Sequence, residues 1–256
     1  MIGQALLNHL SRVGDLCPDD RAAVLGVQGD VRTFRRHEDI SKTGALPCFS
    51  VVVVTGFLQR YVSRRDGSRQ IHSFYIPGDA PSLESMHLDY LDSSLSAAVP
   101  SEIALIPHGE LQDLMRARPR VQSLIWRSSL IQSALYREWL MRNSRLAADR
   151  AMAHLFCEIF MRSEAAGLVV ANSCEMPTTQ ETLSHALGVT PVHVNRTLQQ
   201  LRENGLVELK NGRLYIPHFD RLAQLGEFDP QYLHLRTGRA PVTPQASRMM
   251  RQPAVN

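Results

Sequence analysis

Residues 188–216 read GVTPVHVNRTLQQLRENGLVELKNGRLYI, a stretch with a helix start, a helix stop and a tight turn in close succession. Thr190 followed by Pro191 predicts a helix N-terminus, because threonine caps free backbone N–H groups and proline at the first helical position has no N–H to satisfy. Asn211 and Gly212 lie between LVELK and RLYIP. This dipeptide favours the turn that joins two antiparallel strands, so it predicts a β-hairpin.

A shorter helix is predicted immediately before this one. In TTQE, residues 178–181, a threonine lies three residues before a glutamate, which is the pattern of a reciprocal helix cap. Gly188 and Gly205 predict the ends of the two helices, because glycine readily adopts the backbone conformation that follows a helix. Helix, short turn, helix and hairpin together indicate a winged helix-turn-helix.

The second helix has two faces of different chemistry. Val194, Leu198 and Leu201 form an apolar stripe, and the opposite stripe holds Val192, Asn195, Arg196 and Gln199. Arginine can donate twice to guanine, asparagine can pair with adenine, and valine can touch a thymine methyl group. We therefore interpret the outward stripe as a DNA-reading face, with an ordinary solvated helix face as the alternative. The candidate DNA-binding residues are Thr178, Thr179, Thr190, Val192, His193, Asn195, Arg196 and Gln199.

The N-terminal half is predicted to be mostly β, because short apolar runs between about residues 31 and 106 are separated by turn residues. Residues 57–63 and 70–76 predict a hairpin around Asp66-Gly67. Residues 93–99 and 101–107 predict a second strand pair, separated at Pro100. The first residues of the chain, with leucines at helical spacing, predict a short amphipathic helix.

A long amphipathic helix is predicted after Pro119. Its apolar stripe consists of Leu124, Ser128, Ile131 and Leu135, which we expect to form a dimer interface, since a monomer would leave the stripe partly exposed. A helix buried against its own β-rich half is the alternative. Residues 143–145 are the expected hinge, and helical character resumes at Leu146.

Composition sets limits on the remaining possibilities. The chain has 256 residues, 44% of them hydrophobic, and a net charge of +3, so a folded core is expected and charge alone identifies no partner. No apolar run approaches the roughly 20 residues that cross a membrane. The four cysteines are scattered, which favours structural thiols in the cytoplasm, although a redox-active cysteine remains an alternative.

The sequence resembles the Crp/Fnr transcription regulators, most clearly in residues 178–216 and in FDPQYLHL at 228–235. The resemblance covers nearly the whole chain and implies an α+β fold with an N-terminal β-roll of the double-stranded jelly-roll type, a long dimerisation helix and a C-terminal winged helix-turn-helix. It implies boundaries at 1–117, 118–144 and 145–228, followed by a tail. It also implies a homodimer that binds palindromic double-stranded DNA and contacts RNA polymerase, with no enzymatic activity.

The tail, residues 229–256, is predicted to be basic and disordered. After Asp229 it contains no acidic residue, and its arginines lie among prolines, threonines and glutamines. The arginines are Arg236, Arg239, Arg248 and Arg251.

Three departures from the family pattern limit what the resemblance implies. Members that bind cyclic AMP carry a Gly-Glu pair and an Arg-Ser/Thr-Ala, whereas residues 77–86 and 92–99 here read PGDAPSLESM and DSSLSAAV. Without the arginine a cyclic phosphate would be desolvated largely uncompensated, so we expect no regulation by cyclic AMP. Cys17 stands alone where iron–sulfur members have a cysteine cluster. Val192 stands where many relatives carry a glutamate, so the operator is expected to differ.

No cofactor is predicted, and the effector is unknown. A haem-binding sensor stays open, with His72 in a strand that faces the expected effector region. Possible metal ligands that could line a β-barrel are His72, His87, His108, Glu84 and Glu102. A cupin-like metal-dependent enzyme is a further alternative, although the paired histidines and nearby glutamate that it requires do not occur. A filled apolar roll would favour regulation without a small ligand, and a polar cavity with an arginine would favour the opposite.

Overall fold

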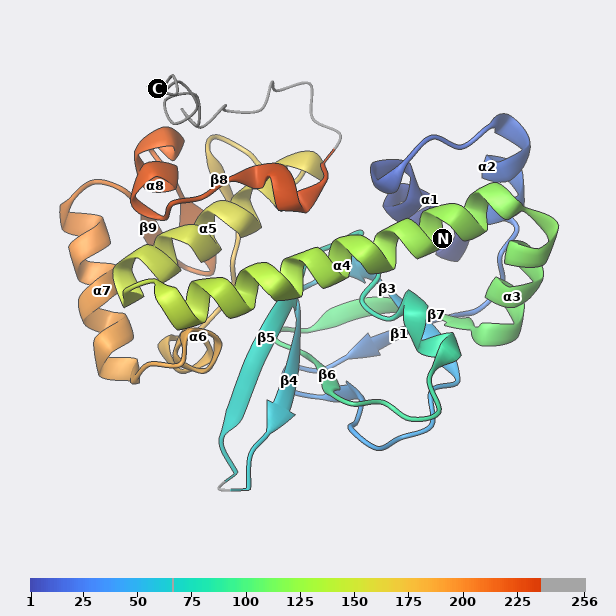
Figure 1. The fold of residues 1–256 in the computed structure, drawn as a ribbon, viewed down its shortest axis with the longest axis horizontal. Helices are drawn as coiled ribbons and strands as arrows, with labels where there is room; N and C mark the ends of the chain where they lie inside the picture. Colours follow the sequence, from blue (N-terminus) through green and yellow to red (C-terminus); the bar gives the residue numbers. More distant parts are fainter. Residues whose placement is uncertain (66, 236–256) are drawn as a thin grey trace, which may run out of the picture.

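The computed structural model describes residues 1–65 and 67–235. Figure 1 shows two bodies, a β-rich half and a helical half, joined along the single long helix α4. The elements of the first body, including α4, are α1 (Ile2–Val13), α2 (Pro18–Leu25), β1 (Asp30–Phe34), β2 (Asp39–Ser41), β3 (Phe49–Thr55), β4 (Leu58–Ser63), β5 (Arg69–Tyr75), the 3-10 helix η1 (Leu83–His87), β6 (Ser94–Ala97), β7 (Ser101–Pro107), α3 (His108–Ala117) and α4 (Pro119–Arg145). The elements of the second are α5 (Ala148–Ala165), β8 (Ser173–Glu175), α6 (Gln180–Leu187), α7 (Pro191–Glu203), β9 (Glu208–Lys210), β10 (Arg213–Tyr215), α8 (Phe219–Leu225) and the 3-10 helix η2 (Pro230–Leu233).

The β-rich half is a roll made of two antiparallel sheets, with strand orders β1-β7-β3 and β2-β6-β4-β5. Val51, Ile103 and Leu105 point into the space between the sheets, where they pack with Leu58 and Leu95. The residues that alternate with them in β3 and β7 point the other way, into a second cluster with α1, α3 and α4. Both strands are therefore apolar on both faces, which explains their continuous apolar runs.

The prediction that the two strands on either side of Pro100 pair with each other is wrong. The two strands form, but β6 pairs with β2 and β4, whereas β7 pairs with β1 and β3 in the other sheet. The chain crosses between the sheets at this point, which a linear sequence cannot distinguish from a hairpin. The hairpin of β4 and β5 forms as predicted.

Helix α4 buries the stripe that the sequence assigned to a dimer interface. Leu124 is 2% exposed in the cluster that includes α1, and Leu135 is 6% exposed against Met161 and Leu233. The hydroxyl of Ser128 and Nε2 of His9 form a 2.8 Å hydrogen bond. The premise that a monomer leaves this stripe exposed is thus wrong, because α1 and η2 of the same chain cover it. Ile131 is half-buried between the two groups.

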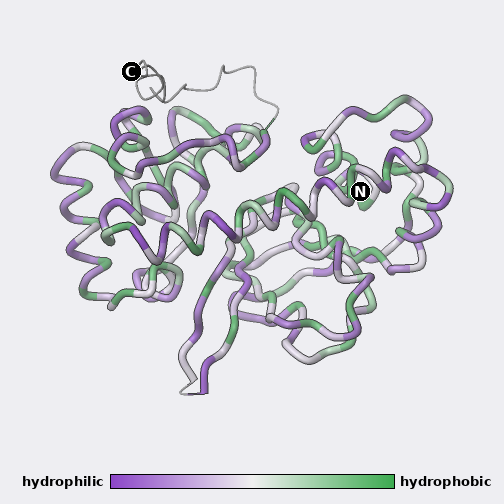
Figure 2. Tube along the Cα trace, viewed as in Figure 1, coloured by the Kyte–Doolittle hydropathy of each residue, from purple (hydrophilic) through white to green (hydrophobic). Residues whose placement is uncertain are grey.

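The break between α4 and α5 lies at residues 146–147, slightly later than the expected hinge at 143–145, which is still helical. The helical half then packs α5 against α6, α7 and α8, with a small sheet in the order β8-β10-β9. Figure 2 shows hydrophobic and hydrophilic residues alternating along α4 and α7, as expected for helices with one covered face. None of the helices in residues 1–65 and 67–235 is long and apolar enough to cross a membrane.

The start of the predicted disordered tail is ordered. Residues 230–233 form η2, Leu233 is 3% exposed, and the Tyr232 hydroxyl donates to Glu158 at 3.2 Å. Apolar and aromatic side chains in FDPQYLHL bury this segment against α4 and α5. The prediction of disorder relied on the absence of acidic residues and did not take these apolar side chains into account. The four arginines of the tail lie outside the described residues.

Candidate nucleic-acid interface

Helix α6 is capped one residue later than the sequence pattern suggested. Thr179 is the N-cap, and its Oγ1 accepts from the N–H of Thr182 at 3.0 Å. Thr178, three residues before Glu181, has a buried Oγ1 without a hydrogen-bond partner among the described residues. The helix ends at Gly188, whose φ of 69° is left-handed, so the chain can turn directly into α7.

Helix α7 begins as predicted. The Oγ1 of Thr190 accepts from the N–H of His193 at 3.2 Å, and Pro191 occupies the first helical position. Val194, Leu198 and Leu201 are buried in the core of the helical half. This packing fixes which face of α7 points to solvent.

The candidate base-reading side chains lie together on that solvent face. Val192 is 80% exposed, although it is apolar, and Asn195 and Arg196 are exposed in the first two turns of α7. Gln199 is also exposed and donates to Glu203 at 2.9 Å. His193 is only half-buried and lies at the edge of this face. Among the described residues, the side chains of Asn195 and Arg196 have no hydrogen-bond or ion-pair partner. An exposed valine beside an amide and a guanidinium group is an arrangement that can contact base edges.

Thr178 and Thr179 form a separate group near the wing. They line a hollow of ≈190 Å³ between the start of α6, α7 and the turn at Asn211-Gly212. Arg202 and Lys210 line the same hollow. Free N–H groups at a helix start together with two cations favour a phosphate group, so these two basic residues extend the candidate set. The sequence analysis did not select them, because Arg202 lies at the far end of α7, about two turns after Asn195, and Lys210 lies on β9.

The interior of the roll holds an arginine that the sequence did not predict. Arg60 on β4 is 6% exposed and donates to the hydroxyls of Tyr75 and Ser93, each at 3.1 Å, and to the carbonyl of Pro81. No carboxylate among the described residues lies within 4.0 Å of it. Burial opposes its charge, but the nearby Tyr75 raises the pKa of Arg60.

A cavity of ≈340 Å³ opens beside this guanidinium. The hydroxyl groups of Ser82 and Ser85 line it, together with Lys42 and the loop that contains Cys48. The remaining space between the sheets is filled by apolar side chains. The roll therefore has both features that the sequence posed as alternatives, an apolar core and a polar cavity with an arginine. Because Arg60 lies beside Ser93, the absence of an arginine from residues 92–99 does not leave this region without a cation.

A buried ionic cluster joins the helical half to the roll. Glu158 on α5 is 0% exposed and accepts from Nε1 of Trp139 at 3.0 Å and from Arg162 at 3.1 Å. Arg162 also donates to Asp79 of the roll at 2.7 Å. Although burial opposes it, the guanidinium groups of Arg162 and Arg12 lower the pKa of Asp79. This cluster holds α5 against the roll through charge-assisted hydrogen bonds.

The histidines considered as metal ligands do not come together. No group of three or more His, Cys, Asp or Glu side chains in residues 1–65 and 67–235 could hold a metal ion. His72 packs its ring edge-on to Tyr136 at 5.7 Å, and burial and Arg60 lower its pKa to about 4. His108 bonds to Ser85 at 3.2 Å. The two exposed cysteines, Cys17 and Cys48, are far apart in the sequence and free.

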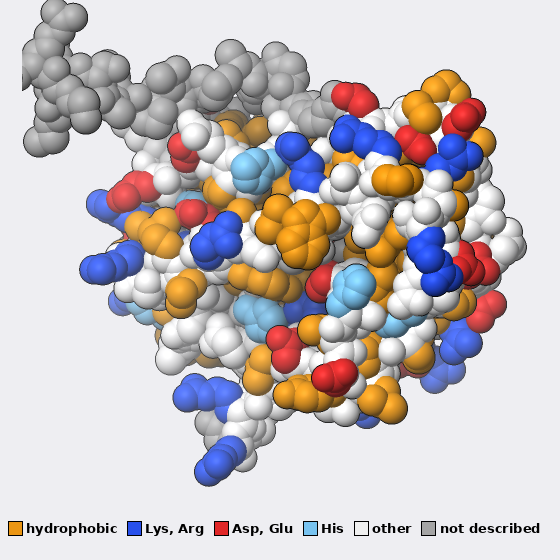
Figure 3. Space-filling model, turned by 45° about the vertical axis from the view of Figure 1, so that its right-hand side comes forward, with side chains coloured by type: hydrophobic (Ala, Val, Ile, Leu, Met, Phe, Trp, Pro, Cys, Tyr) orange, Lys and Arg blue, Asp and Glu red, His pale blue; other side chains and the backbone are white. Residues whose placement is uncertain are grey.

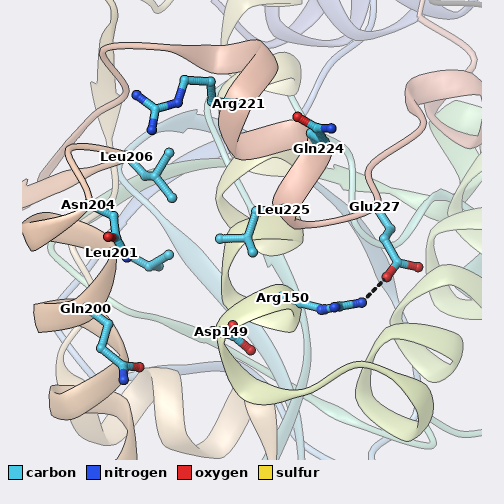
Figure 4. Close-up of a pocket in the computed structure, with 10 residues that line it drawn as sticks. All are labelled: Asp149, Arg150, Gln200, Leu201, Asn204, Leu206, Arg221, Gln224, Leu225 and Glu227. Carbon is cyan, nitrogen blue, oxygen red and sulfur yellow. Dashed lines mark hydrogen bonds and ion pairs between the residues drawn. The ribbon is translucent and has the colours of Figure 1, made fainter.

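Two further surface features are prominent. Helix α4 leaves Trp126, Leu130 and Leu140 exposed by 68%, 53% and 73% on the side away from its covered stripe. A groove of ≈600 Å³ lies between α5, the end of α7 and α8. Figure 4 shows the residues that line it, among which Arg150 pairs with Glu227. The groove has mixed charge and contains none of the exposed stripe of α7, so it is not part of the candidate interface.

Comparisons with known proteins agree with this geometry. Residues 150–225 match the model of the Crp-like helix-turn-helix domain. The transcriptional activator protein FnrL of Cereibacter sphaeroides is 23% identical over 215 residues, covering 81% of this chain and 85% of the relative. The nitrogen fixation regulation protein FixK of Azorhizobium caulinodans is 23% identical over 192 residues, covering 75% and 77%. The solved structure of FixK2 from Bradyrhizobium japonicum is similar in fold, with a TM-score of 0.68 at 22% identity over 78% of this chain and 98% of that one.

Proposed function

We propose that this chain, a DNA-binding transcription regulator of the Crp/Fnr type, binds a palindromic operator as a homodimer and reads it with the N-terminal half of α7. The observation that carries the proposal is the solvent face of α7, where Val192, Asn195 and Arg196 are exposed while the opposite stripe is buried. The N-terminal residues of a recognition helix are those that contact base edges in the major groove. Thr178, Thr179, Arg202 and Lys210 would contact phosphates beside it.

The homodimer would form through the exposed face of α4. Trp126, Leu130 and Leu140 lie four and ten residues apart along the helix and are apolar, so a second copy of α4 would remove them from water. A two-fold axis along this face would present two copies of α7 to half-sites about one helical turn of DNA apart, roughly 34 Å. The partners proposed are therefore double-stranded DNA, a second copy of the chain and, for activation, RNA polymerase. We propose that the protein has no catalytic activity and that it acts in the cytoplasm, where it meets its DNA.

The test of base reading is Arg196→Ala. If Arg196 contacts guanine with two donors, the variant should lose about 1–3 kcal/mol of binding free energy per half-site and relax its preference at one base pair of each half-site. Binding of wild type and variant would be measured on single-base variants of a DNA site selected from a random library. Arg116→Ala, an exposed arginine on α3, is the control. Unchanged base preference in Arg196→Ala would refute the assignment of this residue.

A second candidate function, sensing of a small anion, is favoured by Arg60. A buried guanidinium without a carboxylate partner among the described residues, facing a cavity of ≈340 Å³ lined with serine hydroxyls, can hold a carboxylate or phosphate group. Low affinity for cyclic AMP itself remains our expectation, because none of residues 92–99, where cyclic-AMP-binding members carry the phosphate arginine, lines this cavity. Inorganic phosphate, succinate and cyclic AMP would be titrated while the melting temperature is followed. Stabilisation of the wild type but not of Arg60→Met would support an anion at this site, and equal stabilisation of both proteins would refute it.

A further inference from the structure

The hairpin of β4 and β5 projects from the roll beside the helix-turn-helix. In Figure 1 its tip, the N-terminal end of α7 and α6 all lie toward the same lower side of the molecule. The amide of Gln70 on β5 donates to the carbonyl of His185 on α6 at 2.8 Å, which fixes the contact between the two elements. The hairpin therefore borders the surface that we propose binds DNA.

The tip of this hairpin is strongly basic. Arg64 and Arg65 are exposed, Arg69 follows four residues later, and Asp66 is the only acidic residue of the turn sequence. No ion pair joins these three arginines to a described carboxylate. Figure 3 shows blue side chains at the end of the arm that extends from the lower part of the molecule. A projecting group of arginines attracts polyanions and offers little to a neutral partner.

Contacts along the hairpin join its two strands to each other and to α6. The guanidinium of Arg69 lies 4.4 Å from the ring centre of Tyr61 on the paired strand. Tyr61 and Ile71 belong to the same buried cluster as Leu183 and Leu187 of α6. The strands thus share a core with the first helix of the helix-turn-helix, which places the hairpin next to α6.

We propose that Arg64 and Arg65 at the tip of this hairpin bind the phosphate backbone of DNA beside the half-site read by α7. The proposal rests on the proposed DNA-binding function and extends its interface from the helical half to the roll. Charge complementarity and continuity with α6 favour this contact, because backbone phosphates extend along the duplex past the bases that α7 contacts. The contact would contribute affinity and register but no base preference.

The experiment compares the double variant Arg64→Ala/Arg65→Ala with the wild type and with two control double variants. Arg64→Lys/Arg65→Lys keeps the charge, and Arg35→Ala/Arg36→Ala removes two adjacent exposed arginines from the turn between β1 and β2. Each protein is titrated with a selected DNA site, at several salt concentrations, on a long duplex and on one trimmed to the half-sites. The slope of log affinity against log salt falls by about 0.9 for each phosphate that the protein no longer neutralises.

The expected result for the alanine pair is a slope shallower by about 2 to 4 on the long duplex, because the homodimer carries two copies of the hairpin, with unchanged base preference. The wild type should lose affinity when the flanks are trimmed, and the alanine pair should lose much less. The lysine pair should retain most of the slope. An alanine pair with the slope of the wild type and of the Arg35/Arg36 control would overturn the proposal. That outcome differs from failure of the proposed function, in which the wild type selects no sequence and Arg196→Ala changes nothing.

Discussion

Helices α4 and α7 both bury an apolar stripe, yet they expose side chains of different chemistry. Helix α7 buries its apolar stripe and exposes its polar one, apart from Val192. Helix α4 buries Ser128 and Arg142 and leaves Trp126 and Leu130 in water. The exposed apolar side chains of α4 suit a second protein chain, and the exposed polar face of α7 suits a charged partner. This difference is why we propose α4 for the dimer contact and α7 for DNA.

The largest effect is expected from the polar interior beneath α4. Glu158→Gln removes the charge that faces Arg142 at 3.6 Å and Arg162 at 3.1 Å, in a position that is 0% exposed. An uncompensated buried charge typically costs about 3–5 kcal/mol, so urea unfolding should show a loss of this order. Glu175→Gln, at an exposed position of β8, is the control. Similar losses in both variants would mean that the ionic cluster does not stabilise the junction.

The exposed face of α4 gives the next largest effect. Leu130→Glu should weaken the homodimer about 100-fold, roughly 2.7 kcal/mol, because a leucine in each copy loses its apolar burial. Leu25→Glu on α2 is a matched control, since Leu25 is 48% exposed and Leu130 is 53% exposed. Sedimentation equilibrium measures the dissociation constant. If Leu25→Glu and Leu130→Glu behave alike, the dimer uses another surface and the contrast between the two helices loses its explanation.

A pH dependence is expected from the polar contact between α1 and α4. His9 is buried between the carbonyl of Gly78 and the hydroxyl of Ser128, and burial and then Arg12 lower its pKa to about 4. The unfolded chain therefore binds the proton first, so stability is complete above about pH 6.5 and falls as the pH drops toward 4. The loss is at most about 3 kcal/mol. Asp79, whose pKa is lowered, contributes only below this window.

The check on this pH dependence is His9→Gln. Unfolding by urea at pH 7 and pH 4.5 should show a smaller stability difference for the variant than for the wild type. His218→Gln, at an exposed position, should behave like the wild type. An unchanged difference in His9→Gln would assign the pH dependence to other groups, among them His72.

The smallest effect concerns the helix cap of the helix-turn-helix. Thr179→Ala should cost about 1 kcal/mol, because it removes the acceptor for the N–H of Thr182. Thr178→Val should be neutral or slightly stabilising, because it replaces a buried hydroxyl without a partner among the described residues by a methyl group of the same shape. Thermal unfolding distinguishes the two. If Thr178→Val destabilises the protein more than Thr179→Ala does, the N-cap is Thr178, as the sequence pattern suggested.

Local sequence signals were sufficient to predict the helix-turn-helix and the wing. Thr190, Pro191, Gly188 and the Asn211-Gly212 turn act through contacts within about four residues, so their effect can be predicted without knowledge of the fold. The buried and exposed stripes of α7 followed from the same local periodicity. Even here the cap was misplaced by one residue, because adjacent threonines present the same pattern.

The way in which the two halves fit together depends on contacts that form only in the folded chain. The bond from Arg162 to Asp79 spans 83 positions of the chain, and that from His9 to Ser128 spans 119. Arg60 reaches Ser93 from another strand, so a sequence motif confined to residues 92–99 could not predict this cation in the roll. The periodicity of α4 showed that one face is apolar but could not say whether α1 or a second chain covers it. The spacing of apolar residues along a helix indicates which face is buried. Which surface covers that face depends on contacts between segments far apart in the sequence.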